Sequence, residues 1–318
     1  MSDGAPAGSI PLGPGGEFDA IRTMLARWGD RARGIGDDAA VLALPRGDHL
    51  VASVDASVEG VHFRAGWLAP REIGRRAATA ALSDLAAMAA RPLGVLVAIE
   101  ASDAWRDALG DIADGIGDAL ADVGAPVIGG NMTRGPQLSL TITVLGHAHT
   151  ALRRDGVRAG DRLYVTGRLG GPSAALEAWL AGTEPSPACR ARFVAPSARI
   201  REARWLADAG ATAGIDVSDG LVADLGHLAH ASGVRIVLDA ERVPRLEGLA
   251  IDAALRGGEE YELVVASPTA LDTAEFERRF GVALTHIADA RVAETPGVDV
   301  RLRTRRVAPP SGYDHYSG

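Results

Sequence analysis

Hydrophobic and polar positions along the chain predict helices and strands that alternate. Residues 49–55 (HLVASVD) and 138–147 (LSLTITVLGH) alternate apolar with polar side chains, which is the pattern of a half-buried strand. Residues 70–90 form a long Ala-rich stretch that we interpret as a helix. The pattern also predicts helices near 17–28 and 104–122, and strands at 93–100 and in the residues that run into VIGG.

The second half of the chain mixes the two kinds of element in the same way. A strand at 162–167 (RLYVTG) runs into a glycine turn, and residues 213–233 predict a strand that passes directly into a helix. Further strands complete this half, at 234–239, 261–266 and 298–304. We therefore expect an α+β or α/β protein with two domains, residues 16–150 and 151–318, after a flexible leader of residues 1–15.

Composition narrows the class of protein. Hydrophobic residues make up 47% and charged residues 23% of the chain, which is typical of a soluble globular protein. The formal net charge of −8 argues against broad nucleic-acid binding, and no apolar run approaches the roughly 20 residues that cross a bilayer. The single cysteine, Cys189, excludes an internal disulfide and fits a reducing compartment. We therefore expect a cytoplasmic protein with no nucleic-acid or membrane partner.

The basic residues carry further information, because all 33 of them are arginine. A lysine Schiff base is therefore excluded, and so is a P-loop, whose lysine contacts the nucleotide phosphates. If this protein handles nucleotides, their phosphates must be bound by backbone N–H groups, arginine and metal ions.

Two adjacent aspartates, Asp37 and Asp38, follow two glycines in GIGDDAAVLAL and precede an apolar run. The spacing G-x-G-x-x-A partly matches a dinucleotide-binding fingerprint. However, Pro45 breaks the run before it could form the long helix that such a site needs, so we reject that interpretation. Divalent cations would neutralise the two neighbouring negative charges.

Further aspartates lie in apolar surroundings or at the ends of predicted elements. Asp84 lies in AATAALSDLAAMAA, where an unpaired carboxylate is costly unless it binds a metal ion or faces water. Asp216 and Asp219 lie where a strand becomes a helix, and there a carboxylate can cap the helix while free N–H groups suit phosphate. Because magnesium bridges carboxylates to phosphate oxygens, we interpret one set of aspartates as candidate metal ligands: Asp37, Asp38, Asp55, Asp84, Asp216 and Asp219.

Glycine pairs occur in VIGGNMTRGP (127–136) and LRGGEEYEL (255–263). Each is an ordinary turn signal by itself, but glycines beside a strand also allow close approach of the backbone to phosphate. His227 and His230 are three apart on a predicted helix and have no evident third ligand. We therefore interpret them as a surface pair rather than a zinc site.

Taken in order, the motifs resemble those of thiamine-monophosphate kinases, and the resemblance spans about Gly16 to Tyr316. The stretches VEGVHF and SDGLVADLGH are the most specific. The wider superfamily, which is similar to aminoimidazole ribonucleotide synthetase, shares the acidic and glycine motifs but not the full set. The motifs that carry the resemblance are GEFDAI, GIGDDAAV, DASVEGVHF, ALSDLAAMAARP, IGGNMTRGP, GDRLYVTGRLGG, IDVSDGLVADLGHLA, LRGGEEYEL and GYDHY.

The resemblance implies transfer of the γ-phosphoryl group of ATP to thiamine monophosphate, which gives thiamine diphosphate and ADP, with several magnesium ions. It implies a two-domain fold like that of aminoimidazole ribonucleotide synthetase, with a C-terminal α/β sandwich. It also implies a homodimer in which the N-terminal sheets of two chains pair into a barrel. Direct phosphoryl transfer needs no covalent intermediate, and no side chain is expected to act as a nucleophile.

Matching by position gives the residues that the resemblance implies for each ligand. The metal ligands would be Asp37, Asp38, Ser53, Asp55, Asp84, Asn131, Asp216 and Asp219. The residues that contact ATP would be Gly129, Gly130, Asn131, Arg154 and Ser218. The residues that contact thiamine monophosphate would be His62, Glu259 and Tyr313.

Two positions depart from the family pattern. Asn131 stands where the family usually has an aspartate, and Val54 stands where it usually has a threonine. The resemblance assigns both positions to one metal ion, so that site would be weaker or rebuilt with water. Two alternatives therefore stay open: a related ATP-dependent enzyme with a different acceptor, and a nucleotide-binding homologue with reduced turnover.

Overall fold

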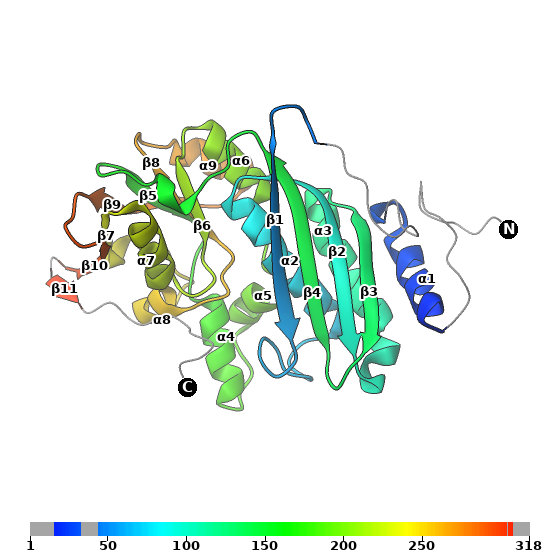
Figure 1. Cartoon of the computed structure of the whole chain (residues 1–318). Coiled ribbons are helices and arrows are strands. Elements are labelled where there is room, and N and C mark those ends of the chain that lie inside the picture. The colour runs from blue at the N-terminus through cyan, green and yellow to red at the C-terminus, as the bar shows by residue number, and fades with distance from the viewer. Residues whose placement is uncertain (1–15, 33–43, 304, 308–318) are drawn as a thin grey trace. The chain divides into compact units, whose positions relative to one another are not determined.

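The computed structural model of the chain describes residues 16–32, 44–303 and 305–307 (Figure 1). The chain separates into two compact units. The first unit contains the residues up to Leu85 together with Ala90–Thr150, and the second unit contains Ala86–Ala89 and the residues from Ala151 onward. Within the described ranges, no helix combines the length and the apolar character that crossing a membrane requires.

The first unit is built on a sheet with the strand order β1-β4-β2-β3. Antiparallel pairs join β1 to β4 and β4 to β2, whereas β3 runs parallel to β2. Figure 1 shows α2 and α3 behind this sheet and α1 beside β3. The bounds are α1 (Gly16–Trp28), η1 (Gly29–Arg31), β1 (His49–Val58), α2 (Pro70–Ala87), β2 (Arg91–Ala101), η2 (Asp103–Ala108), α3 (Leu109–Val123), β3 (Val127–Arg134) and β4 (Ser139–Ala148).

The two faces of this sheet differ in burial, as the alternating pattern of residues 138–147 predicts. Leu140, Ile142 and Val144 on β4 are fully buried, and the residues between them are only half-buried. In the antiparallel pair, Val54 of β1 lies opposite Thr143, on the face turned away from these core residues. We call this the outer face, and the face that carries Leu140, Ile142 and Val144 the inner face.

Two glycines bring α2 and α3 into close contact. A Cβ atom on Gly115 would lie 1.8 Å from the carbonyl oxygen of Arg71, and one on Gly74 would lie 2.0 Å from that of Ile112. The Arg71 side chain also pairs with Asp118, at 2.7 Å between Nε and Oδ2. Any larger side chain at either glycine would push the helices apart, so these residues fix the position of α2, which carries Asp84.

The second unit is built on a sheet with the strand order β11-β10-β7-β9-β5-β8-β6. Its neighbouring strands are antiparallel, except that β10 and β7 are parallel. The strands are β5 (Arg162–Thr166), β6 (Ala213–Asp216), β7 (Arg235–Asp239), β8 (Leu263–Ser267), β9 (Leu284–Arg291), β10 (Gly297–Leu302) and β11 (Arg305–Val307). The helices are η3 (Arg154–Gly156), α4 (Gly171–Leu180), α5 (Pro187–Val194), α6 (Ile200–Asp208), α7 (Leu221–Ser232), η4 (Ala240–Arg242), α8 (Ile251–Arg256) and α9 (Thr273–Phe280).

The core of the second unit holds α7 against the sheet. Leu221, Leu225 and Leu228 recur at the spacing of one helical face, and all three are fully buried in the cluster that contains Ile236 of β7 and Val264 of β8. The predicted switch from strand to helix within 213–233 is therefore confirmed. It places the loop between β6 and α7 over the end of a buried strand.

One helix and one strand illustrate how the structure differs from the pattern-based expectation. The helix predicted for residues 104–122 is two elements, because residues 103–108 form the 3₁₀ helix η2 before α3 begins. Strand β9 was not predicted, although it lies between β7 and β5. Leu163 of β5 pairs with Ala288 and Tyr164 pairs with His286, so Ile287 is an extra residue at a bulge. That bulge interrupts the alternation by which a strand is found.

Candidate functional site

In the first unit, β1 and α2 bring predicted metal ligands together on the inner face of the sheet. The hydroxyl of Ser53 donates a hydrogen bond to Oδ2 of Asp84 at 2.5 Å. Asp84 is half-buried on α2, and this bond explains how a carboxylate is tolerated among its apolar neighbours. Asp55 is two residues beyond Ser53 on the same strand, so its side chain leaves the same face. These oxygen donors suit a hard cation such as magnesium.

One of the two glycines predicted to contact phosphate is also required by the packing of the sheet. A Cβ atom on Gly130 would lie 2.1 Å from the carbonyl oxygen of Val97 on the neighbouring strand, so only glycine fits there. Gly129 precedes it, and Asn131 follows it on β3 with an exposed side chain. Because Asn131 pairs with Ala98, which is opposite Thr141, its side chain belongs to the outer face.

Val54 and Asn131 lie on strands at opposite edges of this sheet. Val54 is level with Gly129, since the row across the sheet runs from Val54 through Thr143 and Leu96 to Gly129. Three inter-strand spacings separate β1 from β3, which is about 14 Å. A single chain therefore does not bring Val54 and Asn131 to one metal ion.

In the second unit, the loop between β6 and α7 carries a further set of predicted ligands. Asp216 is buried at the end of β6, and Ser218 and Asp219 follow it with half-buried side chains. One oxygen of Asp224, Oδ2, accepts the backbone N–H groups of Ser218 at 3.1 Å, Asp219 at 3.3 Å and Gly220 at 3.1 Å. Asp224 therefore occupies three amides of the loop just before the helix, and the suitability of the first helical turn for phosphate stays a prediction. The loop also presents the Asp219 carboxylate.

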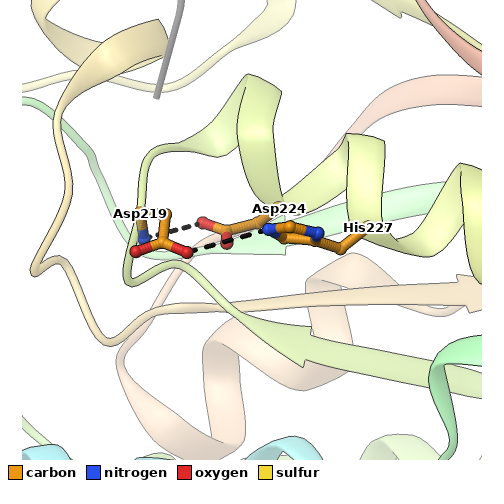
Figure 2. A group of neighbouring side chains, drawn as sticks. All are labelled: Asp219, Asp224 and His227. Atoms are coloured by element: carbon orange, nitrogen blue, oxygen red, sulfur yellow. Dashed lines mark hydrogen bonds and ion pairs between the residues drawn. The ribbon is translucent and has the colours of Figure 1, made fainter. Parts of the chain in front are cut away.

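Acidic side chains gather at this loop, where Figure 2 shows Asp219 and Asp224 beside His227. Burial, together with the neighbouring carboxylates of Asp216 and Asp219, raises the pKa of Asp224 to about 8. His227 on α7 places Nε2 3.7 Å from Oδ2 of Asp219. One ligand atom from each of Asp219, Asp224 and His227 lies within 4.8 Å of the other two. His227 and His230 are both exposed on α7, as expected of surface histidines, and His227 additionally lies beside the acidic loop.

The loop that carries Glu259 is fastened to the same region. The N–H of Glu259 donates to the carbonyl oxygen of Ser218 at 2.8 Å, and the N–H of Tyr261 donates to that of Val217 at 3.0 Å. Glu259 and Tyr261 both adopt left-handed backbone conformations, with φ of 59° and 53°. Such conformations are unfavourable for side chains with a Cβ and persist where surrounding contacts impose them, often at functional sites. The structure therefore brings two predicted site residues, Glu259 and Ser218, side by side.

Behind this loop lies a buried cluster of charges. Glu262 accepts hydrogen bonds from Arg199 at 2.6 and 2.8 Å, from Arg192 at 2.7 Å and from the Thr166 hydroxyl at 2.6 Å. Burial alone would raise the pKa of Glu262, but the two guanidinium groups lower it to about 2. Burial raises the pKa of the neighbouring Glu260 to about 8, although its Oε1 accepts the N–H of Gly170.

The sequence matches two family descriptions in succession. These are AIR synthase related protein, N-terminal domain, over residues 36–148, and AIR synthase related protein, C-terminal domain, over residues 158–290. The thiamine-monophosphate kinase of Salmonella typhimurium is 35% identical, over 95% of this chain and 98% of that protein. The chain belongs to the thiamine-monophosphate kinase family.

Solved structures of thiamine-monophosphate kinases share the fold. The enzyme from Stenotrophomonas maltophilia K279a has a TM-score of 0.79 and 35% identity, with 90% of this chain and 96% of that chain covered. AaThiL complexed with AMPPCP and TMP has a TM-score of 0.75 and 28% identity, with 94% and 96% covered. The predicted fold, a mixed α/β protein of two domains like that of AIR synthase, is thereby confirmed.

Of the remaining predicted residues of the thiamine-monophosphate kinase pattern, Arg154 and His62 are described, and the others fall outside the described residues. Arg154 begins η3 with an exposed side chain, and its carbonyl oxygen accepts the hydroxyl of Ser232 at 2.7 Å. His62 follows β1 and is half-buried. The residues that fall outside the described ranges are Asp37, Asp38 and Tyr313.

The sequence did not single out Asp224 or the cluster around Glu262. For Asp224 a signal exists, since an acidic residue in the first turn of a helix after glycine can reach back to the free N–H groups. Glu262 gives no comparable signal. Its partners Arg199 and Thr166 are 63 and 96 positions away along the chain, and only the fold brings them together.

Proposed function

We propose that this member of the family transfers the γ-phosphoryl group of ATP to thiamine monophosphate, releasing thiamine diphosphate and ADP. The observation that carries the proposal is the similarity to thiamine-monophosphate kinases over nearly the whole chain, 95% of it for the Salmonella enzyme. The solved relative that holds AMPPCP, an ATP analogue, together with TMP supports the same pair of substrates.

Magnesium is the cation that the oxygen ligands fit. In the first unit Ser53, Asp55 and Asp84 would hold it, and in the second unit Asp216 and Asp219 would do so. When bound, magnesium neutralises charge on the phosphate oxygens of the nucleotide. Asn131 would offer a neutral amide oxygen in place of a carboxylate, which suits a weaker or more hydrated site.

The chain's own residues would position the two substrates. The proposed ATP contacts are Gly129, Gly130, Arg154 and Ser218. This set contains no lysine, in agreement with a chain that has none. His62 and Glu259 are the proposed contacts for thiamine monophosphate. An oxygen of the acceptor phosphate forms the new bond to the γ-phosphorus as the bond to the ADP oxygen breaks, so no side chain acts as a nucleophile.

A coupled assay of ADP release tests this function. We expect turnover with thiamine monophosphate and magnesium, and background rates with thiamine or with an aminoimidazole riboside. Release of ADP with a different acceptor alone would favour a related enzyme. Tight nucleotide binding without turnover would favour the homologue of reduced activity.

The outer face of the first sheet supports a homodimer. An antiparallel sheet with one solvated face usually carries polar residues there. Here Leu50 and Val54 of β1 are 53% and 60% exposed, and Leu96 and Leu145 add half-buried leucines to the same face. Such an apolar face fits a second copy of the chain. Pairing of two copies would also supply β3 of one chain to β1 of the other, which would unite the positions of Val54 and Asn131 in one site.

Replacing Val54 by arginine is expected to convert the dimer to a monomer and to lower turnover, because the new charge would be buried at the interface. Light scattering at micromolar concentration measures the mass. Leu180→Arg is the matched control, since Leu180 is 58% exposed on α4 of the second unit. A fully active wild-type monomer would contradict the proposed dimer.

A further inference from the structure

We infer that Glu59 is a positioning residue that fixes the loop carrying His62 and thereby sets the affinity for thiamine monophosphate. The loop consists of residues 59–63 and follows directly after β1, which ends at Val58. We call it the His62 loop. The inference rests on the proposed contact of His62 with that substrate.

Hydrogen bonds of the His62 loop fix the orientation of the imidazole. Nδ1 of His62 accepts the backbone N–H of Val58 at 3.1 Å, and the His62 N–H donates to the Val58 carbonyl oxygen at 2.9 Å. The Gly60 N–H donates to the carbonyl oxygen of Phe63 at 2.7 Å and tightens the turn. Since Nδ1 is an acceptor, the neutral ring carries its proton on Nε2, where it is a donor suited to a phosphate oxygen.

Glu59 ties this loop to two other segments of the first unit. Its Oε2 accepts the indole Nε1–H of Trp105 on η2 at 2.9 Å and the backbone N–H of Leu138, just before β4, at 3.1 Å. Its backbone N–H donates to the carbonyl oxygen of Leu138 at 2.9 Å. One half-buried carboxylate oxygen therefore holds the loop against η2 and against the start of β4.

An aromatic contact beside the Glu59 carboxylate also holds the His62 loop against η2. Phe63 is buried and meets Trp105 edge to face, with ring centroids 6.4 Å apart. The indole is thus held by Glu59 at its N–H and by Phe63 at its ring. Without the carboxylate, two N–H donors would lose their acceptor and the His62 loop would keep only the ring contact with η2. Binding and catalysis depend on placing the contacting groups to within about 1 Å. A less firmly held His62 loop would therefore lower the affinity for thiamine monophosphate.

The test compares three variants of the full chain for kcat and for the KM of each substrate. Glu59→Ala removes both hydrogen bonds, so we expect the KM for thiamine monophosphate to rise about tenfold while the KM for ATP changes less than about twofold. Glu59→Gln keeps an acceptor oxygen for both donors and is expected to restore most of the affinity. Trp105→Phe removes one donor and keeps the ring, so its KM should fall between these two. Glu177→Ala, at an exposed position on α4, is the matched control.

The outcomes separate this inference from the proposed function. If the wild-type chain shows no turnover of thiamine monophosphate, the proposed function fails and this inference fails with it. If the wild type is active and Glu59→Ala raises both KM values equally or neither, Glu59 is merely structural and the inference alone is overturned. If Glu59→Ala does not fold, Trp105→Phe decides, because an unchanged KM for thiamine monophosphate in that variant overturns the inference.

Discussion

Replacing Asp84 by asparagine is expected to lower kcat/KM by about a hundred- to a thousandfold, the cost of removing one charge-stabilising group from a phosphoryl-transfer site. The fold should persist, because asparagine keeps an acceptor oxygen for the Ser53 hydroxyl and nearly the same volume beside the buried Leu85. What the variant loses is the negative charge that would bind magnesium.

The measurement is initial rate against free magnesium at saturating ATP, with a thermal melt to confirm folding. Asp122→Asn is the matched control, since Asp122 is 60% exposed on α3 and pairs only at the surface with Arg75. We expect that control to keep wild-type activity. Wild-type activity in folded Asp84→Asn would mean that Asp84 serves only to bond Ser53.

Replacing Glu262 by glutamine is expected to lower the free energy of unfolding at pH 7 by about 3–5 kcal/mol, the usual cost of breaking a buried ion pair. The amide is neutral and can donate as well as accept. It would take from the guanidinium groups of Arg199 and Arg192 their shortest ionic contact, leaving Arg199 only the longer pair with Glu202 at 3.4 Å.

The same residue predicts how acid acts on stability. The pKa of Glu262 is lowered in the folded chain from its usual 4.5 to about 2. A lowered pKa of a carboxyl contributes stability that is present above pH 4.5 and is lost as the pH falls toward 2. The difference in stability between the wild type and Glu262→Gln should therefore shrink across that window.

Urea denaturation at pH 7, 5, 4 and 3 measures this difference. Glu275→Gln is the matched control, because Glu275 lies on α9 and pairs with Arg278 at the surface, where such pairs contribute about 0–1 kcal/mol. A difference for Glu262→Gln that stays constant from pH 7 to pH 3 would contradict the role assigned to its charge.

The pattern of the sequence predicted those features that depend on the order of consecutive residues. The strands at 49–55 and 138–147 were predicted because one face of each is more buried than the other. Apolar and polar side chains therefore alternate along consecutive residues. Asp84 was found for a similar reason, since a carboxylate in an apolar stretch is conspicuous without any knowledge of its partner. Its partner, Ser53, was assigned only through the family resemblance.

What escaped prediction depends on contacts between distant residues. Strand β9 was missed because a bulge opposite Leu163 and Tyr164 breaks its alternation, and the bulge is a property of the pair of strands. The Glu262 cluster was missed because its partners, Arg192 on α5, Arg199 just before α6 and the hydroxyl of Thr166 on β5, have no local signature. The Asp224 contacts were missed because they reach back from α7 to the amides of the preceding loop, whose conformation the sequence pattern does not give.

The three bonds that Asp224 makes have a consequence for competition among anions. A helix start with open amides gathers free phosphate or sulfate from solution, which would then contend with a nucleotide for the same place. Here a carboxyl oxygen of the chain itself accepts the amides of the loop before the helix, and the carboxyl groups of Asp216 and Asp219 lie near it. Under the proposed function, these carboxyl groups would repel an anion that arrives without a cation, so free phosphate would compete poorly there with a nucleotide that carries its metal ion.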